Sequence, residues 1–378
     1  MPRLFPRRTF LSLLVASTPL WRGVVRAAAA KAGGWPGYRD AMVIDSLGGP
    51  GVYGSDDFAP LSAAALADVR ASGLTAVNLT VSGVGSYALD YDRTIRHLAY
   101  WSAQVAAHPD VLLEVRTAAD VATAKRSGRL GLIYGFQDAT PLGEDLERVE
   151  TFWNLGVRIF QLTYNRRNLV GDGCMEPGNA GLSEFGRKLI ARLNARPALV
   201  DLSHAGERTT LEAIEASTQP VAISHTGCAA IAPHPRNKTD AELRKVAERG
   251  GYVGIYLMPY LRTQGQPMAE DVLRHLQHAL DVCGEDHVGI GTDGTISPVA
   301  VTPEFQRKFA DEVNERRKLG IAAPGEDANV YTFIPDVNVA NRFERLAELL
   351  SGRQYSSLQI AKVLGGNFLR LVREVWGA

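Results

Sequence analysis

Short apolar runs alternate with segments of helical hydrophobic spacing from about residue 41 onwards. The apolar runs predict eight strands, at residues 41–45, 74–81, 130–136, 158–163, 198–202, 221–224, 252–257 and 287–291. The segments between them predict helices, at residues 61–72, 91–108, 118–127, 146–155, 183–195, 209–216, 240–249 and 271–283. This alternation indicates parallel βα units, and eight of them predict an α/β fold of the TIM-like (β/α)8 barrel class. A ninth short run, at 111–115, is either an extra edge strand or no strand at all.

The regular alternation ends after Asp293. Residues 297–335 include Pro303, Pro324 and Pro335 and a charged helical segment at 304–318, which predicts an insertion, around 296–336, over the face that carries the strand ends. Two more helices are expected, near 342–352 and 357–376. Residues 31–378 are therefore predicted to form a single barrel domain, and this length is sufficient to bury a large core.

The first 30 residues have the build of an export signal: a basic start, an apolar middle and a run of small residues. Arg7 and Arg8 precede Thr9-Phe10-Leu11, which resembles the twin-arginine motif. A signal for the general secretion route and an uncleaved anchor are the alternatives. We expect cleavage within residues 27–30 and export by the twin-arginine machinery to the periplasm or the outside. No later segment has 18 consecutive apolar residues, so no membrane span is expected after cleavage.

The composition gives no support for a nucleic-acid partner, and it does not decide whether the cysteines are bridged. Lysine plus arginine and aspartate plus glutamate both number 41, so no long-range charge favours nucleic acid as a partner. The three cysteines cannot form a complete disulfide framework. Either Cys174 and Cys228 form a bridge in an oxidising compartment, or all three cysteines are thiols.

Candidate chemistry gathers where the predicted strands end. Two successive strands run into Ser-His, at His204 and His225, and the last strand runs into Asp293. The carboxyl ends of parallel barrel strands meet on one rim, where active groups collect. Two imidazoles and a carboxylate suit a divalent metal such as zinc, and Asp293 could also take a proton from activated water. Arg236 and Asn237 lie on the same rim, where an arginine can bind a substrate carboxylate through two hydrogen bonds. Hydrogen-bonded structural histidines and a solvated arginine are the alternative interpretations.

Several segments together resemble a known family. They are GVRIFQLTYNRRN, GLSEFGRKLIARLN, ALVDLSHAG, PVAISHTG, PRNKTDAELRKVAERGGYVGI, HVGIGTDG and GGNFLRLVREVW. In this order they resemble the membrane (renal) dipeptidase family, peptidase family M19 of the amidohydrolase superfamily. The resemblance implies a barrel of the metal-dependent hydrolase type, a dipeptide substrate, two zinc ions bridged by a glutamate, and a homodimer. It implies that His204 and His225 are ligands of the second metal, that Asp293 handles the proton, and that Arg236 holds the substrate carboxylate.

The chain departs from the family pattern at the remaining ligands. The first strand of the family ends in His-x-Asp, whereas this chain has Leu47 and Gly49 at the matching positions. The bridging glutamate corresponds to Gln137, which is neutral and a weak ligand. A histidine expected to polarise the substrate carbonyl is replaced by Tyr164, which can still donate a hydrogen bond. The sequence is similar to a bacterial branch of the family that carries Gly-Phe-Gln at this place.

Two functional hypotheses follow. The first is an exported metal-dependent hydrolase that cleaves a dipeptide or similar amide at a reduced, mononuclear site with one zinc ion rather than two. His204 and His225 would hold the ion, with Gln137 or Asp293 as a weaker ligand. Asp293 and Tyr164 would be catalytic, and Tyr164, Arg236 and Asn237 would contact the substrate. The second is a catalytically inactive binding or maturation protein of the periplasm on the same scaffold, with no ion. The chain has no G-x-S-x-G motif for a serine nucleophile.

Overall fold

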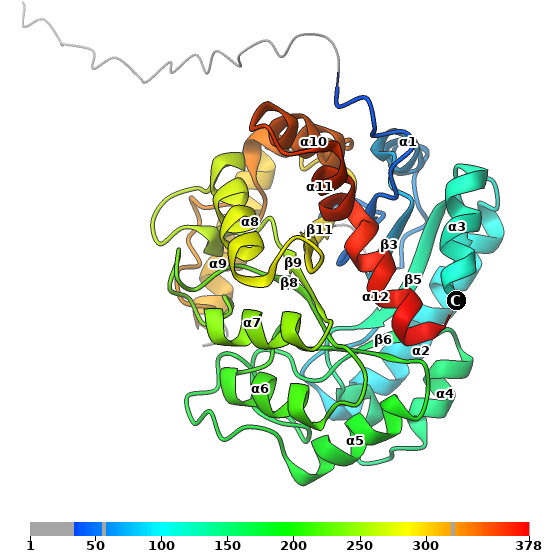
Figure 1. Cartoon of the computed structure of the whole chain (residues 1–378), viewed down its shortest axis with the longest axis vertical. Coiled ribbons are helices and arrows are strands. Elements are labelled where there is room, and N and C mark those ends of the chain that lie inside the picture. The colour runs from blue at the N-terminus through cyan, green and yellow to red at the C-terminus, as the bar shows by residue number, and fades with distance from the viewer. Residues whose placement is uncertain (1–33, 55–57, 319–321, 378) are drawn as a thin grey trace, which may run out of the picture. The chain divides into compact units, whose positions relative to one another are not determined.

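Eight parallel strands form the centre of the molecule (Figure 1). The computed structural model describes residues 34–54, 58–318 and 322–377, so the predicted export signal at 1–30 lies outside the described residues. The strands, in spatial order, are β1 (Ile44–Asp45), β3 (Ala76–Thr80), β5 (Leu130–Phe136), β6 (Val157–Gln161), β7 (Leu199–Asp201), β8 (Ala222–Thr226), β9 (Tyr252–Ile255) and β10 (Val288–Ile290). Spatial order follows chain order, as in a barrel in which each strand pairs with the next.

Hydrogen bonds between the first and last strands close the barrel. Ser46 N, directly after β1, donates to the Ile290 carbonyl of β10 at 3.0 Å. Beyond this contact a second parallel pair joins the same two chain segments, β2 (Gly48–Gly49) with β11 (Gly294–Thr295). The predicted (β/α)8 class is confirmed.

The ninth apolar run is a real strand outside the ring. β4 (Leu112–Glu114) pairs with residues 130–132 of β5, whereas β6 pairs with residues 134–136. Since β3 occupies the other edge of β5, β4 and β6 share one edge and β4 does not interrupt the ring. Of the two alternatives for residues 111–115, the structure has the extra strand.

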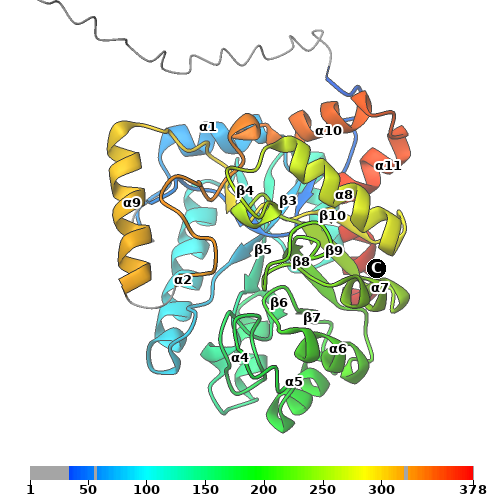
Figure 2. The same ribbon diagram turned by 90° about the vertical axis from the view of Figure 1, so that its left-hand side faces the viewer.

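Helices lie around the outside of the strands (Figure 2). They are α1 (Ala63–Ser72), α2 (Tyr87–Ala107), α3 (Ala118–Ser127), α4 (Arg148–Asn154), α5 (Glu184–Asn194), α6 (Glu207–Ala216), α7 (Asp240–Glu248), α8 (Ala269–Cys283), α9 (Pro303–Lys318), α10 (Arg342–Gly352), α11 (Ser357–Ala361) and α12 (Asn367–Trp376). Local sequence sets several of their starts. Thr117 and Thr239 each form a capping box with an acidic residue three positions later, which satisfies free backbone amides at the helix end. No helix among the described residues is long and apolar enough to span a membrane.

The last predicted helix, 357–376, is wrong as a single element. A turn of π-helix, Lys362–Gly366, separates α11 from α12. A side chain at Gly365 would place its Cβ 2.5 Å from the Met42 carbonyl oxygen and 2.6 Å from Ile44 N. The helix therefore changes its winding where its backbone passes directly against the start of β1. Such a close approach depends on the tertiary fold and has no periodic signal in the sequence.

Helix α12 packs against one end of the strands. One buried cluster contains a residue from each of seven strands together with Phe368 of α12: Ile44, Ala76, Ile133, Ile159, Leu199, Ala222 and Tyr252. These residues lie before the carboxyl ends of their strands, so the apolar filling leaves the opposite rim to polar groups.

A buried carboxyl group lies at the seam of the barrel. Asp45 accepts hydrogen bonds from Thr292 N at 2.8 Å, Thr292 Oγ1 at 2.6 Å and Leu47 N at 3.2 Å. Burial raises the pKa of Asp45 to about 7, and these hydrogen bonds only partly oppose the rise. The seam therefore contains a group that is protonated in the folded protein at mildly acidic pH.

We predict that Asp45→Asn removes a pH dependence of stability. The folded protein holds the Asp45 proton up to about pH 7, whereas the unfolded chain releases it near pH 4. The stability due to this group is therefore complete below about pH 4 and is lost as the pH rises through about 7. As the pH rises from 5 to 8, the free energy of unfolding of wild type, measured with urea, should fall by roughly 3 kcal/mol relative to that of Asp45→Asn. Asp92→Asn, on the exposed face of α2, serves as the control. A difference that does not change with pH would mean that Asp45 is ionised in the folded protein throughout.

Candidate active site

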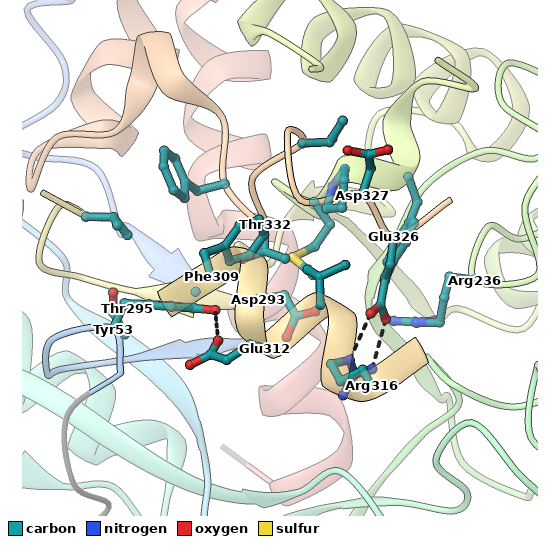
Figure 3. A pocket seen from close by; sticks show the side chains of 18 of the residues that line it. Tyr53, Arg236, Asp293, Thr295, Phe309, Glu312, Arg316, Glu326, Asp327 and Thr332 are labelled. Carbon is teal, nitrogen blue, oxygen red and sulfur yellow. Dashed lines mark hydrogen bonds and ion pairs between the residues drawn. The ribbon is translucent and has the colours of Figure 1, made fainter. Parts of the chain in front are cut away.

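A cavity of about 370 Å³ lies at the carboxyl ends of the strands. Tyr164, His204, Arg236 and Asp293 line its barrel side, after β6, β7, β8 and β10. Helix α9 and the chain from Glu326 to Phe333 line the other side (Figure 3). The structure thus brings four of the predicted site residues into one cavity, and it adds a wall from the segment between β11 and α10.

His204 and His225 share one hydrogen-bonding pattern, in which Nδ1 has a partner and Nε2 has none. Their ring centroids lie 5.0 Å apart, and both rings are buried. His204 Nδ1 lies 2.7 Å from Asn165 Oδ1, and His225 Nδ1 lies 2.8 Å from Ser224 Oγ. Because an amide oxygen only accepts, His204 carries its proton on Nδ1. Both Nε2 atoms are buried and have no hydrogen-bond partner.

A buried carboxylate sets the tautomer of His225. The hydroxyl of Ser224 donates to Asp201 Oδ2, so its oxygen is left to accept from His225 Nδ1. Ser203 Oγ also donates to Asp201, at 2.6 Å. Burial raises the pKa of Asp201, and the two serine hydroxyls oppose the rise. Both serines are buried beneath the rim and do not line the cavity, which agrees with the absence of a serine nucleophile motif.

The paired Nε2 atoms are suited to a metal ion. Neutral imidazole is the form that binds metals, and burial together with the Arg236 charge holds the pKa of both histidines well below its usual value. A hydrogen bond that fixes Nδ1–H and leaves Nε2 to the ion is typical of metal-binding histidines. Two buried nitrogen atoms without partners therefore fit part of the coordination sphere of one ion.

Among the described residues, no third metal ligand is grouped with these two nitrogen atoms. Within the described residues, no group of three histidine, cysteine, aspartate or glutamate side chains could hold a metal ion. Leu47 is buried at the end of β1 and offers no ligand atom. Gln137 does not line the cavity, and its Nε2 donates to Thr80 Oγ1 at 2.9 Å. At the positions that match the expected first-metal ligands, the described side chains thus offer no ligand atom apart from the amide oxygen of Gln137.

Asp293 and Tyr164 are titratable groups that line the cavity together with His204 and Arg236. Asp293 has φ 56°, a left-handed conformation that aspartate tolerates, and its backbone N–H donates to the Leu47 carbonyl at 2.8 Å. Burial raises the pKa of Asp293 to about 6, and the charge of Arg236 partly opposes this. The Tyr164 ring stacks on His204 with 4.2 Å between centroids. Burial and the Asp293 charge raise the pKa of Tyr164 to about 12, so its hydroxyl remains a hydrogen-bond donor.

Arg236 is a buried cation that lacks an anionic partner. It is 3% exposed, and its guanidinium donates to two backbone carbonyls, Ser203 O at 2.6 Å and His225 O at 3.4 Å. No carboxylate of the described chain lies within 4 Å of it. A charge removed from water needs compensation, so the cavity favours an anionic ligand group beside Arg236.

Asn237 lies next to Arg236 but plays a different part in the structure. Its Nδ2 donates to the carbonyls of Ala232 at 2.7 Å and Tyr260 at 2.8 Å, and its Oδ1 accepts from the Tyr256 hydroxyl. The side chain does not line the cavity. These bonds hold the loop that carries Arg236, so the structure places Asn237 as a support for this loop.

Helix α9 belongs to the predicted insertion at 296–336, but none of its residues was among the predicted site residues. Phe309, Glu312, Val313 and Arg316 line the cavity, at a spacing that puts them on one face of the helix. Arg316 forms two hydrogen bonds with Glu326, at 2.8 and 2.9 Å. The helical spacing of these residues was the available signal, but nothing in it says which surface the helix covers.

The three cysteines are free in the structure. Cys228 Sγ contacts the His275 carbonyl at 3.5 Å, and Cys174 Sγ lies 3.6 Å from Asn165 Oδ1. Of the two alternatives for the cysteines, the structure has the thiols.

Comparison with known proteins agrees with this architecture. The model of the membrane dipeptidase family (peptidase family M19) matches residues 64–302. Dipeptidase verJ of Clonostachys rogersoniana is 32% identical over 49% of this chain and 48% of its own length. Dipeptidase tcpJ of Claviceps purpurea is 30% identical over 68% of this chain and 54% of its own length. The chain thus spans about half the length of these two relatives.

A solved structure matches over almost the full length. The amidohydrolase from Pseudomonas aeruginosa is 32% identical, with a TM-score of 0.76 over 90% of this chain and 98% of the other. The family model alone covers well over half of the chain. This chain therefore belongs to the membrane dipeptidase family, peptidase family M19.

Proposed function

We propose that this chain is an exported metal-dependent hydrolase of dipeptidase type with a reduced, mononuclear site. The observation that carries the proposal is the pair of buried, unpartnered Nε2 atoms of His204 and His225. The fungal relatives are described as dipeptidases. The cavity combines a cation without an anionic partner, a carboxyl group and a phenol, a set that suits the binding and hydrolysis of a dipeptide or similar amide.

Each residue has a part in this proposal. His204 and His225 would hold the ion, with Asp293 or the amide oxygen of Gln137 as a weaker third donor. The chemistry that a zinc ion supplies when bound is Lewis acidity, which makes water a usable nucleophile near neutral pH. Asp293 takes a proton from the attacking water and returns it to the leaving amine. Tyr164 donates a hydrogen bond to the substrate carbonyl, and Arg236 binds the substrate carboxylate. The homodimer implied by the family resemblance stays a prediction.

A second candidate is a binding or maturation protein without catalytic activity. It rests on Leu47, Gly49 and Gln137, which stand where ligands of the first ion are expected. Binding of a dipeptide that is insensitive to a chelator and not followed by turnover would favour this candidate.

We predict that the purified protein contains about one equivalent of a divalent metal by elemental analysis. His204→Ala and His225→Ala should each lose this metal, because each removes one of the two buried nitrogen donors. At a zinc concentration a hundred times the Kd, wild type should gain about 2.7 kcal/mol in the free energy of unfolding. His278→Ala, which changes a histidine paired with Asp240 on the surface, should retain both properties. Less than a tenth of an equivalent of any divalent metal, with no metal-stimulated hydrolysis of a dipeptide panel, would contradict the proposal.

A second prediction concerns Arg236→Lys. Lysine keeps the charge but cannot form two parallel hydrogen bonds with a carboxylate. The loss of one charge-assisted hydrogen bond, about 1.5–3 kcal/mol, should raise KM for a dipeptide roughly 10- to 100-fold. The same dipeptide with a C-terminal carboxamide should show little change, since it lacks the carboxylate. Arg244→Lys, on the exposed side of α7, provides the control. Equal losses for both substrates would place Arg236 outside carboxylate binding.

A third prediction tests export, which we propose from Arg7 and Arg8 alone. Changing both to lysine should abolish appearance of the protein in the periplasmic fraction, because the twin-arginine route depends on this pair. Cell fractionation and immunoblotting measure it, with a conservative change at Arg3 as the control. Unaltered export of the lysine variant would point to the general secretion route.

A further inference from the structure

Helix α9 places a carboxylate at the cavity. Glu312 lies on the face of α9 that also carries Phe309, Val313 and Arg316, and all four side chains line the cavity (Figure 3). Glu312 is half-buried, so its carboxylate is partly removed from solvent. The question is which group of a ligand this carboxylate would meet.

The charges that line the cavity are not all paired. Arg316 and Glu326 neutralise each other through two hydrogen bonds, at 2.8 and 2.9 Å. Arg236 donates only to backbone carbonyls. Glu312 accepts one long hydrogen bond, 3.4 Å from the neutral Tyr53 hydroxyl, and within the described chain no cation lies within 4 Å of it. Arg342, at the start of α10, also lines the cavity and donates to two backbone carbonyls, Val339 O at 3.1 Å and Ile296 O at 2.9 Å. Beside the acidic Asp293, the described lining therefore keeps two cations, Arg236 and Arg342, and one carboxylate, Glu312 on the α9 side, without an oppositely charged side chain within 4 Å.

Tyr53 and Phe309 place aromatic rings on the Glu312 side of the cavity, and Phe305 packs against both. Tyr53 meets Phe305 edge-on with 5.8 Å between centroids, and Phe305 stacks on Phe309 at 5.8 Å. Aromatic faces attract ammonium groups, and a carboxylate among them adds a hydrogen-bond acceptor. This combination selects for a primary ammonium over a neutral group.

We infer that Glu312 binds the free amino terminus of the substrate and limits it to dipeptides with an unmodified ammonium group. The inference rests on the proposed function, because it places a dipeptide in this cavity with its carboxylate on Arg236. A zwitterionic dipeptide would then meet opposite charges at its two ends. Glu312 is a specificity-determining residue, and the bond-breaking groups remain those of the barrel.

The test compares alanyl-phenylalanine with lactoyl-phenylalanine, in which a hydroxyl replaces the ammonium group at nearly the same size. Binding is measured by calorimetry on chelator-treated full-length protein, which separates it from turnover, and kcat/KM is measured on the metal-loaded protein. The variants are Glu312→Gln, Glu312→Asp and the control Glu315→Gln. Glu315 is on the same helix but exposed, where it pairs with Lys318 at 3.7 Å.

We expect wild type to bind alanyl-phenylalanine at least tenfold more tightly than lactoyl-phenylalanine. Glu312→Gln should reduce this ratio to below threefold by weakening the dipeptide alone. Glu312→Asp should retain part of it, and Glu315→Gln all of it. In kinetics the loss should appear in KM, with kcat little changed.

Equal binding of the two ligands by wild type would overturn the inference, and so would binding of neither ligand. The inference would also be wrong if Glu312→Gln kept the wild-type ratio of the two affinities. Selective binding that depends on Glu312, without hydrolysis under any metal, would support the inference while refuting the proposed function. Hydrolysis of both compounds at equal kcat/KM would do the reverse.

Discussion

The hydrogen bonds that join β1 to β10 are the constraint on which the site depends. Without them the sheet would be open, and the ends of its first and last strands would lie at opposite edges. The Ser46–Ile290 bond and the bonds from Thr292 to Asp45 bring these ends together. Because Asp293 follows Thr292 directly, closure also carries this carboxyl group onto the rim that holds the two histidines. A polar seam with a buried carboxyl group thus serves both the fold and the site.

A layer of buried polar groups beneath the rim orients the histidines. Asp201, Ser203 and Ser224 form a hydrogen-bonded cluster that ends on His225 Nδ1, and Asn165 acts in the same way on His204. Burying these groups is favourable only when their hydrogen bonds are satisfied. The layer is satisfied on its inner side, and the two Nε2 atoms on the outer side are left without partners. Within this layer, the hydrogen-bonding capacity that is not met lies at these two Nε2 atoms, where a ligand would be bound.

The cavity differs in character between its two sides. The barrel side holds a buried neutral imidazole and a buried guanidinium, together with a partly buried phenol and a partly buried carboxyl group of raised pKa. The α9 side is aromatic and carries charges nearer to solvent. In proteins of this fold the strand ends hold the reacting groups, and the loops between strand and helix vary with the substrate. The contrast within this one cavity follows that division.

The sequence by itself determined the elements and the residues of the barrel rim. Strand runs, helical spacing and Ser-His at the ends of two strands depend on local periodicity, so they gave the barrel, the family resemblance and the set that includes His204, His225, Arg236 and Asp293. The tertiary structure alone decided the break in the last helix at Gly365, the position of β4, the support that Asn237 gives its loop, and which residues of α9 line the cavity. These features arise from contacts between residues far apart in the chain: Gly365 against Met42, Asn237 against Tyr256, and Glu312 against Tyr53. Periodicity records which face of an element is apolar, but the surface that this face meets is decided only when the chain packs.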